Sequence, residues 1–272
     1  MTTVVASPER AFNGGSHMTK LAKVFILALA IALVATACGG DDSLEGRTVT
    51  VGVENLYPPF NYIDEATGEG AGFDYDIWRE ICSRLDCTAE FVEAGWPAVI
   101  EETGQGAYDT AADGITITED RKAVVAFSDP YMTTIIKIMV RIDETRYADA
   151  DAFFASDGIL GTQVGTTNYE VATEFTPESK IDAYESFPVA VLALLSGDVD
   201  AVIIDDVAGQ GYQGEGSEGV KLLDGDLSSD SLGFIYAHDS DLIDPVNNVI
   251  ADLKDDGTMD ALIKKWFIDF EA

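Results

Sequence analysis

Stretches typical of strands and stretches typical of helices alternate from residue 47 to residue 268, and this alternation constrains the fold more than any other feature. Residues 48–53 are rich in β-branched side chains, which favour a strand. Ile77, Ile81 and Leu85 recur at the spacing of one helix face. Because helices that alternate with strands usually cover a sheet, the pattern predicts an α/β fold.

The other expected elements follow from the same patterns of apolar residues. We expect further strands over 90–93, 110–117, 134–142, 200–205 and 232–237, and helices over 76–85, 98–102, 168–175, 189–195, 245–253 and 259–267. Thr118 is expected to cap a helix that begins with two acidic residues, which are favourable at the positive end of a helix. Thr167 and Glu170 have the spacing of a capping box for the helix over 168–175. The Gly-rich stretch 209–219 is expected to form a loop.

The chain begins with the pattern of a bacterial export signal. Two lysines precede an apolar run over 24–35, which is shorter than the about 20 residues that a membrane-spanning helix needs. Small residues then lead to Cys38, and the stretch resembles a lipobox in which Ala35 replaces the usual leucine. The resemblance implies cleavage before Cys38 and a lipid on Cys38, with 38–46 as a tether at the outer face of the cell membrane or in a periplasm. The alternative is a plain signal peptide with an incidental cysteine.

Residues 1–37 are therefore excluded from the fold prediction as a signal peptide. Residues 1–17 have no place in such a signal, and Met18 is a better start. The stretch 15–18 resembles a tag remnant, but a misassigned start codon is favoured because an intact signal follows.

The chain has 49 acidic and 16 basic residues, and the formal net charge is −33. Such a charge opposes binding to nucleic acid and to anionic membrane surfaces, and it attracts cationic solutes. Adaptation to a salty habitat is an equally weighted explanation. The sequence has no metal or haem spacing, and its histidines are His17 and His238. We therefore expect no metal, no cofactor and no nucleic-acid partner.

Two cysteines remain once Cys38 carries a lipid. Cys82 and Cys87 form an even pair in an exported protein, where disulfides are common. A disulfide between them is expected, and two buried thiols are the alternative.

The segment 113–121 combines groups that suit the binding of a carboxylate. Gly114 allows close approach of the backbone, Thr116 offers a hydroxyl, and Arg121 falls in the first turn of an expected helix. An arginine binds a carboxylate through two parallel N–H groups, and a helix N-terminus adds positive charge. The alternative is an ordinary capped helix with a surface arginine.

Several short motifs occur in a fixed order along the chain. They are VGVENLYPPF at 51–60, GFDYDI at 72–77, GAYD at 106–109, GITIT at 114–118, FSDPY at 127–131, QVGTT at 163–167, GDVDA at 197–201 and DGT at 256–258. Together they resemble the family 3 extracellular solute-binding proteins of amino-acid ABC transporters. The resemblance implies a two-lobed periplasmic-binding-protein (Venus flytrap) fold of type II, with two mixed sheets flanked by helices. Lobe 1 would comprise 47–133 and 237–272, lobe 2 would comprise 134–236, and the chain would cross the hinge near 131–135 and 234–237.

The resemblance also implies a ligand site in the cleft between the lobes. The implied residues are Glu54, Tyr57, Trp96, Gly114, Thr116, Arg121, Gln163, Thr166, Thr167 and Asp205. Arg121 would hold the α-carboxylate of an amino acid together with the backbone of Gly114 and the hydroxyl of Thr116. Gln163 and the two threonines at the following helix start would contact the ligand from lobe 2. Asp205 would accept the α-ammonium, whereas its alternatives are a strand-end acid in a turn and a substitute role for Asp206.

The side chain of the ligand would meet three further residues. Tyr57 and Trp96 would stack on it, and the alternative for both is a place in the core. Glu54 suits a cationic or amide side chain such as that of arginine, lysine, histidine or glutamine, and the alternative is a surface acid. Val164 and Ile204 depart from the family by making lobe 2 more apolar, which blurs the specificity.

The predicted protein is a monomer that captures a polar or cationic amino acid and delivers it to the permease of an ABC importer. Its lipid is the expected contact with the membrane. One alternative is an enzyme on the same scaffold, similar to periplasmic cyclohexadienyl dehydratases, with Glu54 as a candidate acid or base but no histidine in the ligand segments. Another alternative is a stand-alone ligand sensor.

Overall fold

The computed structural model describes residues 1–3, 43–213 and 219–270. The chain divides into two units, Met1–Asp42 and Ser43–Ala272, and the helices and strands given below belong to the second. The expected export signal, the lipidation site Cys38 and the first part of the tether lie outside the described residues. Within the described ranges, no helix has the length and apolar character that a membrane span requires.

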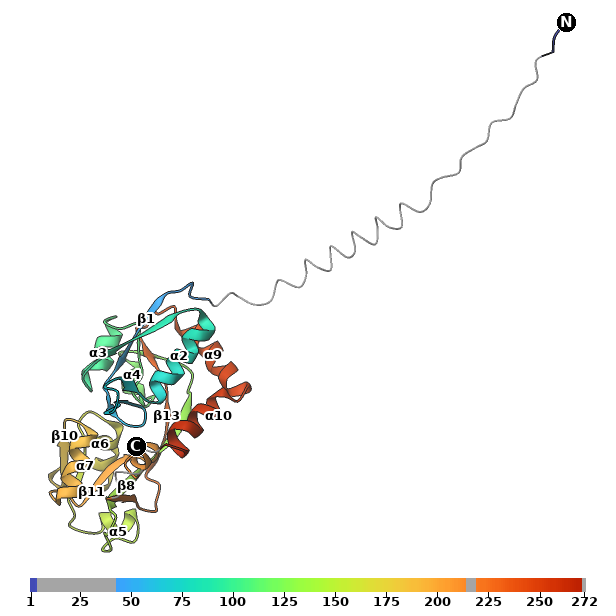
Figure 1. The fold of residues 1–272 in the computed structure, drawn as a ribbon. Helices are drawn as coiled ribbons and strands as arrows, with labels where there is room; N and C mark the ends of the chain where they lie inside the picture. Colours follow the sequence, from blue (N-terminus) through green and yellow to red (C-terminus); the bar gives the residue numbers. More distant parts are fainter. Residues whose placement is uncertain (4–42, 214–218, 271–272) are drawn as a thin grey trace. The chain divides into compact units, whose positions relative to one another are not determined.

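Five strands form the sheet of the first lobe (Figure 1). Their order is β5 (Thr88–Glu93), β1 (Thr48–Val53), β6 (Thr110–Ala111), β14 (Ile235–Tyr236) and β7 (Ala126–Phe127). β1 pairs parallel with β5 and β6, whereas β14 pairs antiparallel with β6 and β7, so the sheet is mixed. Val49, Val51 and Val53 of β1 are fully buried, as the β-branched run predicted.

Helices from both parts of lobe 1 flank this sheet (Figure 1). They are α2 (Phe73–Leu85), α3 (Ala98–Gly104), α4 (Glu119–Lys122), α9 (Ile243–Asp255) and α10 (Thr258–Ile263), and α10 continues into a wider π turn over Lys264–Ile268. α2 contacts α9 and α10, and its Ile77, Trp78 and Ile81 are fully buried. A small three-stranded sheet of β2 (Leu56–Tyr57), β3 (Asn61–Ile63) and β4 (Gly70–Ala71) lies between β1 and α2 in the sequence.

The second lobe has its own mixed sheet. Its strands follow the order β10 (Ile181–Tyr184), β9 (Leu160–Gln163), β11 (Ala201–Asp205), β8 (Met132–Arg141) and β12 (Val220–Leu222), and β13 (Ser228–Leu232) also pairs with β8. β9 is parallel to β10 and β11, whereas β8 is antiparallel to its three neighbours. The helices of this lobe are α5 (Ala150–Phe154), α6 (Thr167–Phe175), α7 (Phe187–Ser196) and α8 (Asp206–Gly211), with a 3-10 turn at Glu178–Lys180.

The chain passes between the two sheets twice, after β7 and after β13. The two crossings are hydrogen-bonded to each other, because Ser128 N donates to Phe234 O at 2.9 Å and Tyr131 N donates to Leu232 O at 3.0 Å. Two mixed sheets flanked by helices and joined by paired crossings are the two-lobed α/β fold that the sequence predicted.

Two expected strands are wrong in extent. The strand expected over 110–117 ends at Ala111, because the chain turns toward the cleft at Gly114, whose φ of +56° suits glycine. The strand expected over 232–237 is two strands in different sheets, since β13 ends at Leu232 and β14 begins at Ile235. Apolar composition alone could not reveal that this stretch changes sheets.

Helix starts also differ from expectation. α2 begins at Phe73 rather than at residue 76, because the buried Phe73 extends its apolar face. α6 is capped by Thr166 rather than Thr167, since Thr166 Oγ1 accepts the N–H of Tyr169 at 3.2 Å. The expected cap at Thr118 is confirmed, with its side chain accepting from Arg121 N. The Gly-rich loop expected from residue 209 begins with the end of α8.

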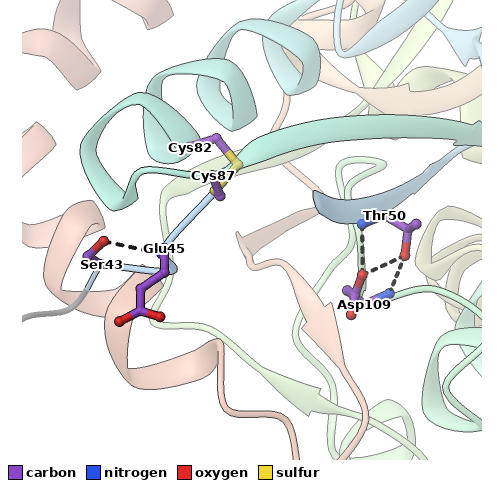
Figure 2. Close-up of a disulfide and its surroundings, with 6 residues drawn as sticks. All are labelled: Ser43, Glu45, Thr50, Cys82, Cys87 and Asp109. Carbon is purple, nitrogen blue, oxygen red and sulfur yellow. Dashed lines mark hydrogen bonds between the residues drawn. A yellow bond between two sulfur atoms is a disulfide. The ribbon is translucent and has the colours of Figure 1, made fainter. Parts of the chain in front are cut away.

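Cys82 and Cys87 are joined in a disulfide, as their even count predicted (Figure 2). The bridge connects the last turn of α2 to the residue before β5, and Cys87 N also donates to Cys82 O at 2.9 Å. Nearby, Asp109 Oδ2 accepts from both the backbone N and the hydroxyl of Thr50, each at 2.8 Å, which fixes β1 beside the start of β6 (Figure 2).

Candidate functional site

The strand ends of both lobes meet around one cavity. The residues that line it are Glu54, Tyr57, Trp96, Asp113, Gly114, Thr116, Arg121, Gln163, Thr166, Thr167, Asn168, Phe187 and Asp205. All ten residues expected at a ligand site are among them, and lobe 1 and lobe 2 both contribute. Carboxyl ends of parallel strands are the usual place for ligands in α/β proteins, because the connecting loops and helix starts converge there.

Arg121 points its guanidinium into the space between the lobes. Its Nη1 donates to Thr116 O at 3.0 Å and its Nη2 to Gly165 O at 3.5 Å, so it contacts both lobes. The guanidinium carbon lies 5.2 Å from the centre of the Trp96 ring. Burial lowers the pKa of Arg121, although a guanidinium stays charged at neutral pH. Its remaining N–H groups have no hydrogen-bond partner in the described part of the chain and can serve a carboxylate.

Asp205 ends β11 on the other side of the cavity and is 5% exposed. Its Oδ2 accepts from Tyr57 Oη at 2.5 Å and from Asn168 Nδ2 at 3.1 Å. Its Oδ1 is buried and has no hydrogen-bond partner among residues 1–3, 43–213 and 219–270. Burial raises the pKa of Asp205, because the charged form loses its hydration, and the charges of Asp230 and Asp206 raise it further. An ammonium group in the cavity would supply that cation.

Glu54 follows β1 and faces Gln163 of lobe 2, whose Nε2 donates to Glu54 Oε1 at 2.7 Å. Burial, and next the negative charge of Asp113, raise the pKa of Glu54 to about 8. Burial likewise raises the pKa of Asp113 to about 7. Asp113 Oδ1 accepts from Asn61 Nδ2 at 2.7 Å, and its Oδ2 has no partner in the described ranges. This side of the cavity therefore combines two acids that form no salt bridge with any described residue, although the charge of Arg121 partly opposes the rise in the pKa of Asp113.

The aromatic residues differ in what they offer a ligand. The ring of Tyr57 stacks on Phe60 and on Phe187, with centroid distances of 5.2 Å and 5.1 Å. Trp96 is half-buried, and its Nε1 donates to Val164 O at 3.2 Å. Trp96 therefore has the more accessible ring, and stacking of either residue on a ligand stays a prediction.

Small residues bring the lobes close together. Thr116 Oγ1 and Thr167 Oγ1 lie 3.2 Å apart across the cleft. A side chain at Gly114 would place its Cβ 3.0 Å from the Tyr57 ring, so only glycine leaves this wall unobstructed. The hydroxyl of Thr166 caps α6 and donates to Gln163 O at 2.8 Å, so it is already used within lobe 2.

The space left inside the cavity is about 20 Å³. That volume suits one water-sized molecule, so an amino acid can enter only when the lobes or their side chains move apart. The cleft is closed by hydrogen bonds between groups of the two lobes that were expected to bind a ligand.

Three residues of the cavity were missed by sequence reasoning, namely Asp113, Asn168 and Phe187. Asp113 could have been found, because it precedes Gly114 in the segment already singled out. Asn168 lies in the first turn of α6 and Phe187 at the start of α7, where only the packing of lobe 2 brings them to Asp205 and Tyr57.

Known proteins are similar to this chain over nearly the whole described region. Residues 49–269 match the family of bacterial extracellular solute-binding proteins, family 3. The chain is 28% identical to the arginine-binding periplasmic protein of Mannheimia haemolytica, over 90% of this chain and 98% of the relative. It is 27% identical to the L-cystine-binding protein TcyA of Bacillus subtilis (strain 168), over 91% and 96% of the two chains.

A solved structure agrees with these relatives. The ancestral amino acid-binding protein AncCDT-1, described as a precursor of cyclohexadienyl dehydratase, superimposes with a TM-score of 0.74 and 34% identity, covering 81% of this chain and 95% of that one. These relatives are named for what they bind rather than for a reaction, which supports a binding protein over the alternative of an enzyme.

Proposed function

Because the chain belongs to the bacterial extracellular solute-binding proteins of family 3, we propose that it binds a single amino acid between its lobes and delivers it to an ABC importer. The observation that carries this proposal is the placement of Arg121 and Asp205 on opposite lobes around one cavity. A zwitterion presents one negative and one positive group, so it can bind both residues at once and hold the lobes together.

The α-carboxylate would bind the free N–H groups of Arg121. Thr116 and Gly114 lie beside Arg121 and add a hydroxyl and backbone groups to its charge. The α-ammonium would donate to Asp205 Oδ1, which lacks a partner among the described residues. Micromolar affinity requires about 8 kcal/mol, which two charge-assisted contacts and burial in a closed cleft can supply.

A cationic side chain suits the rest of the cavity best. Glu54 and Asp113 are buried acids that form no salt bridge with a described residue, and Glu54 in particular gains an opposite charge when such a side chain binds. The arginine-binding relative agrees with this preference. The cystine-binding relative shares the zwitterionic part of the ligand, so it supports the roles of Arg121 and Asp205 without deciding the side chain.

The remaining parts of the proposal concern the cell. The lobe boundaries would lie near those expected, 47–133 and 237–272 for lobe 1 and 134–236 for lobe 2, except that β14 pairs in the sheet of lobe 1 and β8 of lobe 2 begins at Met132. Export, cleavage before Cys38 and lipidation of Cys38 would hold a monomer at the outer face of the membrane. A short tether raises its effective concentration at the permease. Fractionation of cells that produce the full chain tests the anchor, because Cys38→Ser should move the protein from the membrane fraction to the soluble fraction.

A thermal-shift screen of the chain from Gly39 onward tests the binding function. The standard amino acids, polyamines and compatible solutes are compared, since a bound ligand raises the melting temperature by mass action. Arg121→Ala should lower the affinity for any amino acid found by about 30-fold or more, the effect of truncating one partner of a buried charge pair. Lys122→Ala is the matched control, because it removes a neighbouring cation that pairs with Glu119 at the surface. Equal affinities of the two variants in calorimetry would contradict the assignment of Arg121.

A further inference from the structure

Two buried acids of lobe 1, Asp74 and Asp113, share the side-chain amide of Asn61. Asn61 Nδ2 donates to Asp74 Oδ2 at 2.9 Å and to Asp113 Oδ1 at 2.7 Å. The amide is fixed in this orientation, because its oxygen accepts from Asn55 N at 2.6 Å. Asp113 lines the enclosed cavity, whereas Asp74 belongs to the first turn of α2 and does not line it. Asn61 therefore connects an acid in the core to an acid at the cavity wall.

The two acids, which we call the acid pair, have no counter-ion. Asp74 is 0% exposed and Asp113 is 4% exposed, and no lysine, arginine or histidine of the described residues forms an ion pair with either. Asp74 Oδ1 and Asp113 Oδ2 also lack a hydrogen-bond partner in the same ranges. Two carboxylates in such a place are unfavourable, because each loses its hydration and repels the other. At least one proton is therefore expected on the acid pair.

The surroundings decide which acid keeps this proton. Burial raises the pKa of both acids, but the positive charge of Arg121 opposes the rise for Asp113 and no cation does so for Asp74. The start of α2 favours a negative charge, yet Asp74 accepts no N–H group from it in the described chain, so the loss of hydration has the larger effect. The proton is therefore assigned to Asp74 and the negative charge to Asp113.

The other groups around the acid pair do not offer a second cation. Burial, and next the charges of Asp74 and Asp113, raise the pKa of Tyr131, which lies in the crossing after β7. Trp78 lies one turn after Asp74 on α2, and its Nε1 and the hydroxyl of Tyr131 have no hydrogen-bond partner among the described residues. The titratable groups that interact with the charges of the acid pair are Glu54, Tyr57, Tyr75, Arg121 and Tyr131, and Arg121 is the cation of this set.

We propose that Asp74 is a neutral carboxylic acid in the folded protein and that it acts through Asn61 as a positioning residue for Asp113, the proton-exchanging acid of the ligand cavity. When a positive group of the ligand approaches Asp113 Oδ2, the Asp113 carboxyl releases its proton to solvent and keeps the electron pair of the O–H bond as a carboxylate. Asp74 keeps its proton in both states. The exchange at Asp113 rests on the proposed function, whereas the neutral state of Asp74 does not.

Infrared difference spectroscopy of the ligand-free chain from Gly39 onward tests the neutral state of Asp74 at pH 7. Subtracting the spectrum of Asp74→Asn from that of the wild type should leave the C=O band of a protonated carboxyl group. Asp76→Asn is the matched control in the same turn of α2, because Asp76 pairs with Lys265 and its replacement should remove carboxylate bands instead. Carboxylate bands in the Asp74 difference spectrum would overturn the proposal.

A measurement on the wild type keeps the proposal testable if Asp74→Asn does not fold. With carbon-13 in the aspartate carboxyl groups, NMR should show one signal that keeps the position of a protonated acid up to about pH 8, well above the ordinary pKa of an aspartate. The signal should remain when Asp113 or Asp205 is replaced by asparagine. A spectrum without such a signal would show that Asp74 is ionised and would refute its assigned state.

Calorimetry with L-arginine at pH 7 in phosphate and in Tris tests the exchange at Asp113. The two buffers differ in ionisation enthalpy, so the difference in heat gives the number of protons released on binding. With a pKa of about 7, Asp113 is half protonated at this pH, and its ionisation adds about 0.5 proton to the wild-type count. Asp113→Asn should lose this contribution, and Asp74→Asn should lose clearly less. Equal losses in the two variants, or no loss in Asp113→Asn, would refute the exchange.

The two measurements separate this inference from the proposed function. If the wild type does not bind L-arginine, the preference for a cationic ligand and the exchange at Asp113 are both contradicted. The infrared spectra of the ligand-free protein still decide whether Asp74 is neutral. If L-arginine binds without the expected change in proton count, the binding function stands and the role of the acid pair is refuted.

Discussion

Replacing Asp205 by asparagine is expected to stabilise the ligand-free protein and to weaken ligand binding. Asp205 is 5% exposed, and its Oδ1 has no partner among the described residues. Burial raises its pKa, and the carboxylates of Asp230 and Asp206 raise it further. The buried charge is therefore unfavourable without a bound ammonium group. Its removal should stabilise the ligand-free protein and weaken ligand binding.

The magnitudes follow from the contacts of Asp205. Asparagine keeps the shape and retains one oxygen for the donors Tyr57 and Asn168. The substitution removes the buried charge but places an unpaired amide N–H2 where Oδ1 was, so the two terms partly offset, and we expect the free energy of unfolding to rise by up to about 1 kcal/mol and the melting temperature by up to about 2–4 °C. Loss of a buried ammonium–carboxylate pair costs about 2–5 kcal/mol, which weakens binding by about 30-fold to several thousand-fold.

Urea unfolding of the ligand-free protein and calorimetry with L-arginine measure the two effects separately. Asp206→Asn is the control for removal of a charge at the next position. Asp206 Oδ1 accepts from Thr134, Ile135 and Val207, so this control should destabilise the protein without a comparable loss of affinity. Wild-type affinity of Asp205→Asn, or a fall in its ligand-free stability, would refute the assignment of Asp205 as the unpaired ammonium acceptor.

Three further predictions concern the disulfide, the buried acids and the closure of the cleft. Removing the bridge by Cys82→Ser with Cys87→Ser should lower the free energy of unfolding by about 2 kcal/mol, because the loop that it closes is short, and urea unfolding with and without reductant checks this. Glu54 and Asp113 have pKa values raised to about 8 and about 7, so the folded state binds more protons than the unfolded state between about pH 4 and pH 8. These groups should therefore stabilise the folded state at low pH, and the free energy of unfolding should fall as the pH rises to 8, by up to about 1.4 kcal/mol per pH unit for each group. When unfolding is measured as a function of pH, Glu54→Gln should make this fall less steep. Affinity for a cationic ligand should rise over the same range, and a flat profile would count against both roles. Tyr57→Phe removes the donor to Asp205 across the cleft, so small-angle scattering should give a larger radius of gyration for the ligand-free variant than for the wild type, whereas equal radii would show that this bond does not hold the cleft shut.

Features that depend on a short stretch of chain could be predicted from the sequence. The helix cap at Thr118 and the place of Arg121 in the first turn of α4 are local, because they follow from residue types a few positions apart. The order of the motifs, which resembles that of a known family, also predicted that Gln163 and Asp205 share one site, although they come from different strands.

Features that depend on the meeting of distant segments could not be predicted in this way. Phe187 reaches Tyr57 only because α7 of lobe 2 contacts the small sheet of lobe 1. Asp74 and Asp113 share the amide of Asn61 although they belong to different segments of lobe 1, and neither has a neighbour in the sequence that signals this contact. The change of sheet after Leu232 was missed for a similar reason, since strand propensity is the same on both sides of Gly233.

The hydrogen bonds that join the lobes across the cleft use the same groups that a ligand would need. Each of the contacts Tyr57–Asp205, Gln163–Glu54 and Thr116–Thr167 must open before an amino acid can use these groups. At about 1 kcal/mol each, three such bonds leave roughly one molecule in a hundred open and reduce the apparent affinity by the same factor. If the protein delivers its ligand to an ABC importer as proposed, stimulation of the importer's ATPase by ligand-free protein would measure how far the closed cleft alone is recognised.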